Sequence, residues 1–373
     1  MKTADPELMR AINRFHVMDV IRRFGPISRT EISQHTELSA ATVSAITAAL
    51  LEDRLISARP FQESAEAGRG RPRVMLILNS GAAYVAGVKL APHSISVAVT
   101  DFVAEPLATL TMPVRCARQP LSVIADIVED GVRHCVADAG LSLAQINGIC
   151  VGVPGIVDRT RGVCWRSPIF GPEPAAFSEA LAERLDVESK VESAAHLVAL
   201  AEHWFGQGKG LDDFVVVTLE ATVGVGIVHA GELYRSGVGV SADLGWEPVT
   251  APARAGAVGA ALAPSEADRP AAERDAGVNL GRTLARLAGL LGPPRLIVTG
   301  DGVRAGQPFL DAMRQVFESA ITPALRGRVE LVVHDADDHF WARGAAALVL
   351  RELYGAPWNT TGPRILKPEL REA

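Results

Sequence analysis

The chain has few cysteines and no long hydrophobic segment, and both absences narrow its class. Its 373 residues include four cysteines, Cys116, Cys135, Cys150 and Cys164, which are scattered without a close pair. This spacing argues against a zinc cluster and fits a protein of the reducing cytoplasm. Because no run of roughly eighteen apolar residues is present, we expect no membrane span, and the N-terminus lacks the apolar core of a signal peptide.

The chain also lacks an overall positive charge, which at first argues against nucleic-acid binding. Its formal net charge is −6, but the charge is unevenly distributed. Residues 1–73 carry eleven Lys and Arg against nine Asp and Glu, whereas the rest of the chain carries 26 against 34. A mildly basic N-terminal module on an acidic body is compatible with DNA binding. The excess is small, so we expect two modules to act together on a palindromic operator, in a homodimer or tetramer.

Residues 28–56 have the pattern of two short helices joined by a tight turn. Ser28 is placed to cap the first helix, with Glu31 three residues later, and Ser39 to cap the second. Apolar residues of the second helix recur at helical spacing and leave short polar side chains on the opposite face, which suits a recognition helix in the major groove. The alternative is an ordinary helical hairpin with an alanine-rich exposed face. The expected DNA contacts are Ser28, Arg29, Ser39, Thr42, Ser44 and Thr47.

A polar, glycine-rich loop with a strand on each side follows this pair of helices. Strands are expected over 55–59 and 74–79, and helix, strand, loop, strand is the order of a winged helix. Arg69, Arg71 and Arg73 in the loop suit a narrow minor groove, and a solvated basic linker is the alternative. A supporting helix over 6–24 completes a module that spans 1–78. Its inward residues are expected to be Leu8, Ile12, Phe15, Val20, Ile21 and Phe24.

Two sets of α/β elements follow this module. The first, over 79–190, has three consecutive strands, a helix and a strand that runs into a glycine-proline turn. The second, over 191–337, has strands followed by helices that alternate with strands. A closing helix within 338–355 is assigned to the first lobe, and 356–373 to a tail. The repetition predicts a duplicated α/β unit with mixed sheets and a cleft between two lobes.

The bounds of these elements follow from apolar periodicity and from turn residues. The alanine-rich stretch 251–277 is expected to be a mobile or partly helical connection. The expected strands are 84–90, 94–101, 106–114, 146–155, 214–220, 224–234, a return near Val249, 295–302 and 329–335, and the expected helices are 120–139, 177–185, 194–205, 279–290, 308–325 and 340–354.

Two segments of the body resemble the ROK family. They are GICVGVPGIVD at 148–158 and the longer stretch 191–246, and the resemblance extends in order over nearly the whole chain. This family comprises sugar kinases and sugar-responsive repressors, and the repressors carry a winged helix in front. The resemblance implies an α/β chain in which an N-terminal winged helix-turn-helix precedes a two-lobed, actin-like ATPase fold. It also implies a dimer or tetramer that forms through the body.

The chain departs from the family's kinases at the motifs that handle phosphate and sugar. Lys89 stands where the kinases carry a metal-holding Asp, and Ala91 and Pro92 replace the glycines of the same phosphate loop. Ala194 stands at the position of the general base, and alanine cannot accept a proton. Glu220 heads the second phosphate turn, where an acid would repel phosphate, and the family's cysteine-rich zinc motif is absent. Because phosphoryl transfer depends on positioning and electrostatics, we expect no kinase activity, no cofactor and no bound metal.

We therefore expect a DNA-binding transcriptional repressor whose kinase-like body dimerises and senses a sugar or sugar derivative. In the cleft, Trp246 is placed to stack on a sugar face and Asp243 to accept hydroxyl protons. The alternatives are core packing for Trp246 and a surface helix position for His196. An alternative function is a ligand-independent regulator whose body is a dimerisation or protein-docking scaffold. The expected ligand-binding residues are Gly155, Ser193, His196, Asp243 and Trp246.

Overall fold

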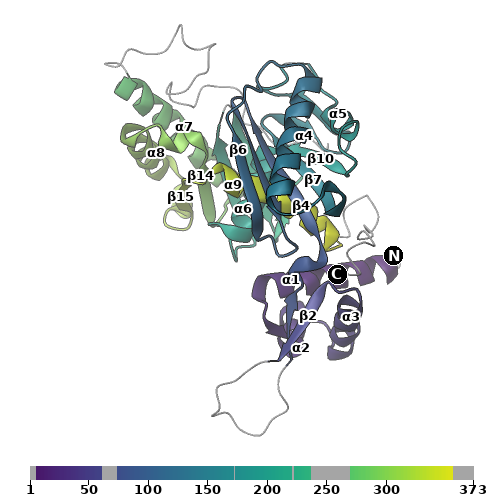
Figure 1. Ribbon diagram of the computed structural model, residues 1–373. Coiled ribbons are helices and arrows are strands. Elements are labelled where there is room, and N and C mark those ends of the chain that lie inside the picture. Colours follow the sequence, from purple (N-terminus) through teal and green to yellow (C-terminus); the bar gives the residue numbers. More distant parts are fainter. Residues whose placement is uncertain (1–5, 61–73, 172, 221, 237–268, 356–373) are drawn as a thin grey trace.

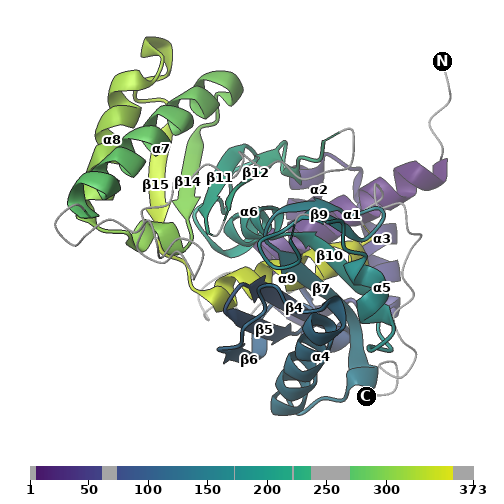
Figure 2. The same ribbon diagram turned by 90° about the horizontal axis from the view of Figure 1, so that it is seen from above.

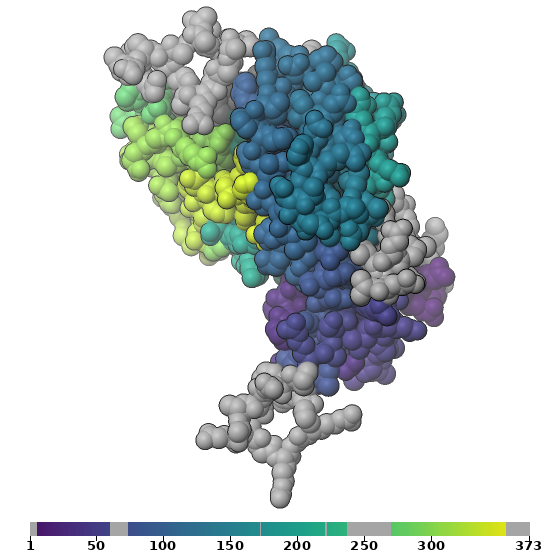
Figure 3. All heavy atoms as spheres, in the orientation of Figure 1, coloured from purple at the N-terminus to yellow at the C-terminus, as the bar shows by residue number. Residues whose placement is uncertain are grey.

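A small N-terminal module lies at one end of a larger α/β body in the computed structural model, which describes residues 6–60, 74–171, 173–220, 222–236 and 269–355 (Figure 1). The module packs directly against the body (Figure 3). Within the described residues, no helix has both the length and the hydrophobicity that a membrane crossing needs. The predicted return strand near Val249 and the tail 356–373 lie outside the described residues.

The N-terminal module has the element order of a winged helix, as the sequence predicts. Three helices surround an antiparallel sheet with the strand order β1-β3-β2. Its apolar residues form one core that continues into the body. The elements are α1 (Pro6–Phe24), β1 (Ile27–Ser28), α2 (Arg29–Thr36), α3 (Ala40–Glu52), β2 (Ile56–Pro60) and β3 (Val74–Leu78).

The buried face of α1 differs from the predicted one. Leu8 and Phe24, which were expected to face inward, are 47% and 48% exposed, whereas Val17 and Met18 are fully buried. The middle of α1 packs both on the other helices of the module and on the body, so its buried stripe is wide there and ends before the termini. Phe24 instead stacks at the surface on His35 of α2, with ring centroids 4.3 Å apart.

The first lobe is built on a five-stranded mixed sheet with the order β10-β7-β4-β5-β6. Alternate residues of β4 face opposite sides: Ala86 and Val88 face a core with α4, and Val85 faces the core of α9. The hairpin of β8 and β9 and the strand β10 were not predicted, and β10 crosses the boundary expected between 190 and 191. The elements are β4 (Tyr84–Ala91), β5 (Ser94–Thr100), β6 (Pro106–Met112), α4 (Leu121–Asp138), β7 (Ile146–Val153), β8 (Ile156–Asp158), β9 (Val163–Arg166), α5 (Phe177–Ala182) and β10 (Ser189–Ser193).

The second lobe repeats the arrangement with the strand order β13-β12-β11-β14-β15. Val215 and Val217 of its central strand face a core with α7 and α8, whereas Phe214 and Val216 face α6. Seen from above, α7 and α8 form an outer layer, and α6 and α9 lie between the two sheets (Figure 2). The elements are α6 (Ala194–Phe205), β11 (Phe214–Leu219), β12 (Val223–His229), β13 (Glu232–Leu233), α7 (Arg269–Leu291), β14 (Arg295–Thr299), α8 (Gln307–Ala320), β15 (Glu330–His334) and α9 (Asp338–Leu353).

Three of the element bounds predicted for this lobe were wrong. The strand expected over 224–234 is a hairpin of β12 and β13, because Ala230 and Gly231 both adopt positive φ and reverse the chain. Helix α7 begins at Arg269, ten residues before the predicted start, so the end of the alanine-rich stretch is helical. Helix α8 ends at Ala320, and Pro323 opens a separate short turn of 3₁₀ helix.

Glycines let the central helices α6 and α9 approach their neighbours closely. A Cβ atom on Gly87 of β4 would lie 1.9 Å from the Ala342 carbonyl oxygen of α9. A Cβ atom on Gly344 of α9 would lie 2.2 Å from the Leu197 carbonyl oxygen of α6. Backbone therefore packs on backbone at both contacts, which leaves no room for even a methyl group.

Gly87→Ala is expected to lower the free energy of unfolding by about 3 kcal/mol, because the new methyl group clashes with a helix backbone that cannot rotate away. Thermal and urea unfolding of both proteins measure this loss. Gly289→Ala in α7 is the matched control, since its Cβ meets only Thr322 Oγ1, at 3.6 Å. It should be neutral or slightly stabilising. Equal stability of Gly87→Ala and the parent protein would contradict the close packing of β4 on α9.

Candidate functional site

The two helices of the predicted helix-turn-helix begin at the predicted caps. The N–H of Ser28 donates to Glu31 Oε2 (2.9 Å) and the N–H of Glu31 donates to Ser28 Oγ (3.3 Å), which completes a capping box. The N–H of Thr42 donates to Ser39 Oγ (3.1 Å) at the start of α3. Glu37, with a φ of 56°, forms the left-handed turn between the helices. The local geometry therefore agrees with a helix-turn-helix.

The solvent face of α3 is made of small side chains. Ser39 and Ser44 are exposed and Thr42 is partly buried, with exposed alanines between them and along the helix. Helix α3 carries no Lys or Arg, so positive charge near it has to come from other elements. Small side chains allow a close approach to a groove, and hydroxyl groups can reach phosphates or base edges.

Thr47 was predicted to face DNA, and the structure shows that it is buried. It lies four residues after Val43 and so falls on the same inward face of α3. Its hydroxyl accepts a hydrogen bond from Arg29 Nε (2.8 Å), and Arg29 remains partly exposed. Thr47 therefore fixes the position of Arg29 beside α3. Arg69, Arg71 and Arg73 lie outside the described residues.

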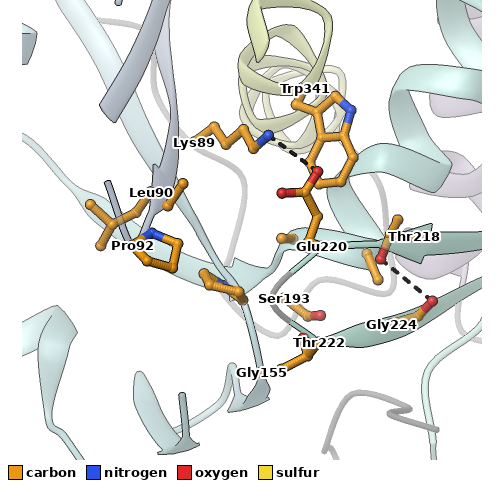
Figure 4. A pocket seen from close by; sticks show the side chains of 14 residues that line it. Lys89, Leu90, Pro92, Gly155, Ser193, Thr218, Glu220, Thr222, Gly224 and Trp341 are labelled. Atoms are coloured by element: carbon orange, nitrogen blue, oxygen red, sulfur yellow. Dashed lines mark hydrogen bonds and ion pairs between the residues drawn. The ribbon is translucent and has the colours of Figure 1, made fainter. Parts of the chain in front are cut away.

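A cleft lies where the ends of the two sheets meet (Figure 4). It spans about 450 Å³, a volume that includes space open to solvent. The first sheet contributes the end of β4 and the turn after β7. The second sheet contributes the turn between β11 and β12, and the first turns of α6 and α9 complete the wall.

Lys89 lies at the centre of this cleft and makes three contacts. Its Nζ is 2.6 Å from Asp338 Oδ1 and 3.5 Å from Glu220 Oε1, and it lies 4.1 Å from the ring centre of Trp341. Burial alone would lower the pKa of Lys89, but the attraction of Glu220 and Asp338 outweighs burial and raises the pKa above its ordinary value. The ammonium therefore stays charged and joins the first sheet to the second.

Glu220 lies opposite Lys89 and makes the floor of the cleft acidic. Burial raises its pKa, attraction to Lys89 opposes this, and the nearby Asp301 and Asp338 raise it further. Glu220 Oε1 also accepts a hydrogen bond from the N–H of Asp301 (3.1 Å). This backbone donor would otherwise be available to an anion, so the carboxylate occupies a place that could hold a phosphate oxygen.

The structure brings two of the predicted ligand-binding residues into the cleft. Gly155 and Ser193 line it. Gly155 adopts a φ of 112°, and a Cβ there would lie 2.0 Å from the Arg166 carbonyl oxygen, so only glycine fits. His196 is neither at the surface nor among the lining residues. It is buried behind the wall, with Nδ1 3.1 Å from Glu192 Oε1. Asp243 and Trp246 lie outside the described residues.

Sequence reasoning missed a buried charge network behind this wall. Glu192 accepts a hydrogen bond from Arg235 Nη1 (2.6 Å), and Arg159 Nε lies 3.9 Å away. Burial would raise the pKa of Glu192, but Arg235, His196 and Arg159 together hold it well below its ordinary value. Arg159 also pairs with Glu352 of α9. Arg159, Arg235 and Glu352 are distant from Glu192 in the sequence, so no local pattern could have indicated their part in the network.

Residues 85–268 match the family described as "ROK family". The chain contains a ROK family domain. The regulator NagC of Escherichia coli strain K12, described as a DNA-binding transcriptional dual regulator, is 26% identical over an alignment of 394 residues that covers 93% of this chain and 94% of NagC. The xylose repressor of Bacillus subtilis strain 168 is 25% identical over 246 residues, which cover 66% of this chain and 62% of that repressor.

Solved structures of ROK family proteins share the fold. A ROK family transcriptional regulator that is a homologue of the E. coli MLC protein has a TM-score of 0.71 and 21% identity, and the match covers 93% of this chain and 97% of that one. A ROK family glucokinase from Streptomyces griseus, in complex with glucose and AMPPNP, has a TM-score of 0.58 and 21% identity, and the match covers 71% of this chain and 99% of the glucokinase. The two lobes therefore have the fold of the family's sugar kinases.

Lys89→Met is expected to lower the free energy of unfolding by roughly 1–3 kcal/mol, because Glu220 and Asp338 lose their cation. The deficit should be larger at neutral pH than at about pH 5, because burial raises the pKa of Glu220 and its protonation removes the unpaired buried charge. Urea unfolding at both pH values measures it. Lys209→Met, at an exposed position, is the matched control and should change little. A deficit that grows on acidification would contradict the assignment.

Proposed function

We propose that this ROK family protein is a DNA-binding transcriptional repressor whose kinase-like body responds to a sugar or sugar derivative. The observation that carries the proposal is the match to NagC along 93% of this chain, which includes the winged helix as well as the body. The glucokinase match covers 71% of this chain, so more than a quarter of the chain has no counterpart in that kinase. The four buried, unpaired cysteines are consistent with a cytoplasmic protein.

The proposed DNA-binding surface is α3 together with the wing. Ser39, Thr42 and Ser44 would face the major groove, and Arg29, held by Thr47, would contact a phosphate at its edge. The wing arginines at 69, 71 and 73 would enter the adjacent minor groove. Because the module carries only a small basic excess, we expect a homodimer on a palindromic operator rather than a single module.

The proposed body binds a ligand but does not transfer phosphate. In the cleft, Glu220 accepts a hydrogen bond from the backbone N–H of Asp301. Lys89 forms ion pairs with Glu220 and Asp338. Ala194, at the start of α6, has no group that can accept a proton from a sugar hydroxyl. Hydroxyl and backbone groups at Ser193, Thr218 and Gly155 are compatible with an uncharged polyol.

The Lys89 ion pairs also favour a second candidate function. The pair of Lys89 with Glu220 joins the first lobe to the second, which is what a body that serves only as a dimerisation or protein-docking scaffold would require. Such a regulator would bind DNA in the same way, but sugars would not change its affinity for DNA. The two candidates therefore differ in a single measurable property, the response of DNA binding to small molecules.

The test is fluorescence anisotropy of the purified full chain on labelled DNA from its own upstream region. A panel of sugars, sugar phosphates and polyols is then added at fixed protein concentration. Salt-sensitive binding that one uncharged sugar releases would support the repressor with a sugar effector. Binding that no compound alters would favour the scaffold, and absence of binding above that to unrelated DNA would contradict both.

Ser44→Glu is expected to weaken DNA binding by about tenfold or more, because it places a negative charge on the exposed face of α3 beside the phosphates. The same anisotropy assay measures the change. Ser319→Glu, at an exposed position in α8 of the second lobe, adds the same charge far from the winged helix and should leave the affinity within about twofold. If both variants bind as tightly as the parent protein, α3 does not face the DNA.

A further inference from the structure

Two helices, α6 and α9, connect the cleft with the winged helix. We propose that they transmit the state of the cleft to the DNA-binding module, and that Arg22 and Trp204 are the positioning residues where the signal enters α1. This inference rests on the proposed function, because it requires that the winged helix bind DNA.

Helix α6 begins in the wall of the cleft and ends beside α1. Ala194 and Ala195 in its first turn line the cleft, whereas His203 and Trp204 lie in its last turn. Every residue from 195 to 204 is buried, so the helix is held on all sides. Its twelve residues span about 18 Å at 1.5 Å per residue. One rigid element therefore reaches from the cleft to the N-terminal module.

Helix α9 makes the same connection alongside α6. Trp341 in its first turn lines the cleft beneath Lys89. At its other end, the Arg351 guanidinium lies 5.8 Å from the ring centre of Phe15 in α1. Tyr354, which follows the helix, stacks on Trp204 with the rings 5.8 Å apart and inclined by 4°. The two helices therefore end together on the same face of α1.

Polar and aromatic contacts fasten α1 to these helix ends. The Arg22 guanidinium lies 4.2 Å from the ring centre of Trp204, and Asp19 holds the same guanidinium at 2.8 Å. Arg23 Nη2 lies 2.8 Å from His203 Nε2. Burial, together with Arg23 and Arg22, lowers the pKa of His203 to about 3, so its neutral ring accepts this hydrogen bond at physiological pH. The junction between α1 and the ends of α6 and α9 is therefore held by directional polar contacts as well as by apolar packing.

Close packing makes the two helices move together. A Cβ on Gly344 of α9 would lie 2.2 Å from the Leu197 carbonyl oxygen, and one on Gly226 of β12 would lie 2.6 Å from the Ala195 carbonyl oxygen. Contacts this close resist sliding, because any shift along the helix axis brings backbone against backbone. A ligand that displaces the first turn of α6 therefore shifts Trp204 as well, and α1 must follow or lose its contacts.

Thermodynamic linkage allows the route to be tested from the DNA end, without knowing the effector. If the conformation of the cleft changes the affinity for DNA, bound DNA must shift the conformational equilibrium of the cleft by the same coupling free energy. Ala194→Cys places a thiol at the cleft end of α6, in a protein whose four native cysteines are buried. The rate of its reaction with Ellman's reagent reports the state of the cleft. A saturating duplex of the chain's own upstream region should change this rate about fivefold or more.

Arg22→Met in the Ala194→Cys protein removes the contact with Trp204 while keeping an apolar side chain. It should still bind the duplex but lose most of the DNA-dependent change in rate. Arg22→Lys keeps a cation over the Trp204 ring and should retain part of the DNA-dependent change in rate. A purely structural role of Arg22 would not produce this partial recovery. The matched control is Arg14→Met, which breaks an ion pair with Asp53 inside the winged helix and should retain the full change.

The outcomes separate the inference from the proposed function. If the Ala194→Cys protein and the parent chain do not bind the duplex, the function fails and the inference fails with it. If DNA binds but leaves the thiol reaction rate unchanged, the function stands and the inference is overturned. If Arg22→Met keeps the full change in rate, the coupling does not pass through this junction and the assignment of Arg22 is wrong. Melting curves confirm that each variant is folded.

Discussion

The structure depends on the contact between the helices α6 and α9, where a glycine brings the two backbones close together. Gly344 of α9 lies against the backbone of α6, and Gly87 of the first sheet lies against the backbone of α9. The first contact joins the two lobes and the second fixes the closing helix to the lobe that it completes. The far ends of the same helices carry Trp204 and Tyr354, on which the winged helix rests. Three parts of the chain are therefore held by one tightly packed centre.

The charges of the cleft are the reason why we propose that a body with the kinase fold does not transfer phosphate. A buried ammonium is costly unless carboxylates surround it, and Glu220 and Asp338 supply them for Lys89. We expect the same carboxylates to oppose nucleotide binding, because they add negative charge to the cleft. Lys89 compensates these carboxylates only in part, so the cleft between the two lobes stays acidic.

Local patterns predicted much of this fold, and long-range contacts account for what they missed. The caps at Ser28 and Ser39 and the order of the winged helix could be predicted because each depends on neighbouring residues. Thr47 was misassigned because its polarity outweighed its position four residues after Val43. The partner of Lys89, Asp338, lies 249 residues away, so the sequence could show the unusual lysine but not what neutralises it. The repeated order of strands and helices predicted the two lobes, and the resemblance to the ROK family added the actin-like ATPase fold.

The claim on which this account depends is that the cleft no longer handles phosphate. Calorimetric titration of the full chain with Mg-ATP, in the absence and presence of glucose, combined with an assay for released ADP, tests it most directly. The account predicts no saturable binding of Mg-ATP up to millimolar concentration and no sugar-dependent ADP, because Glu220 and the pairing of Lys89 oppose the phosphates. Saturable binding with sugar-dependent turnover would contradict it and would identify the body as a working kinase.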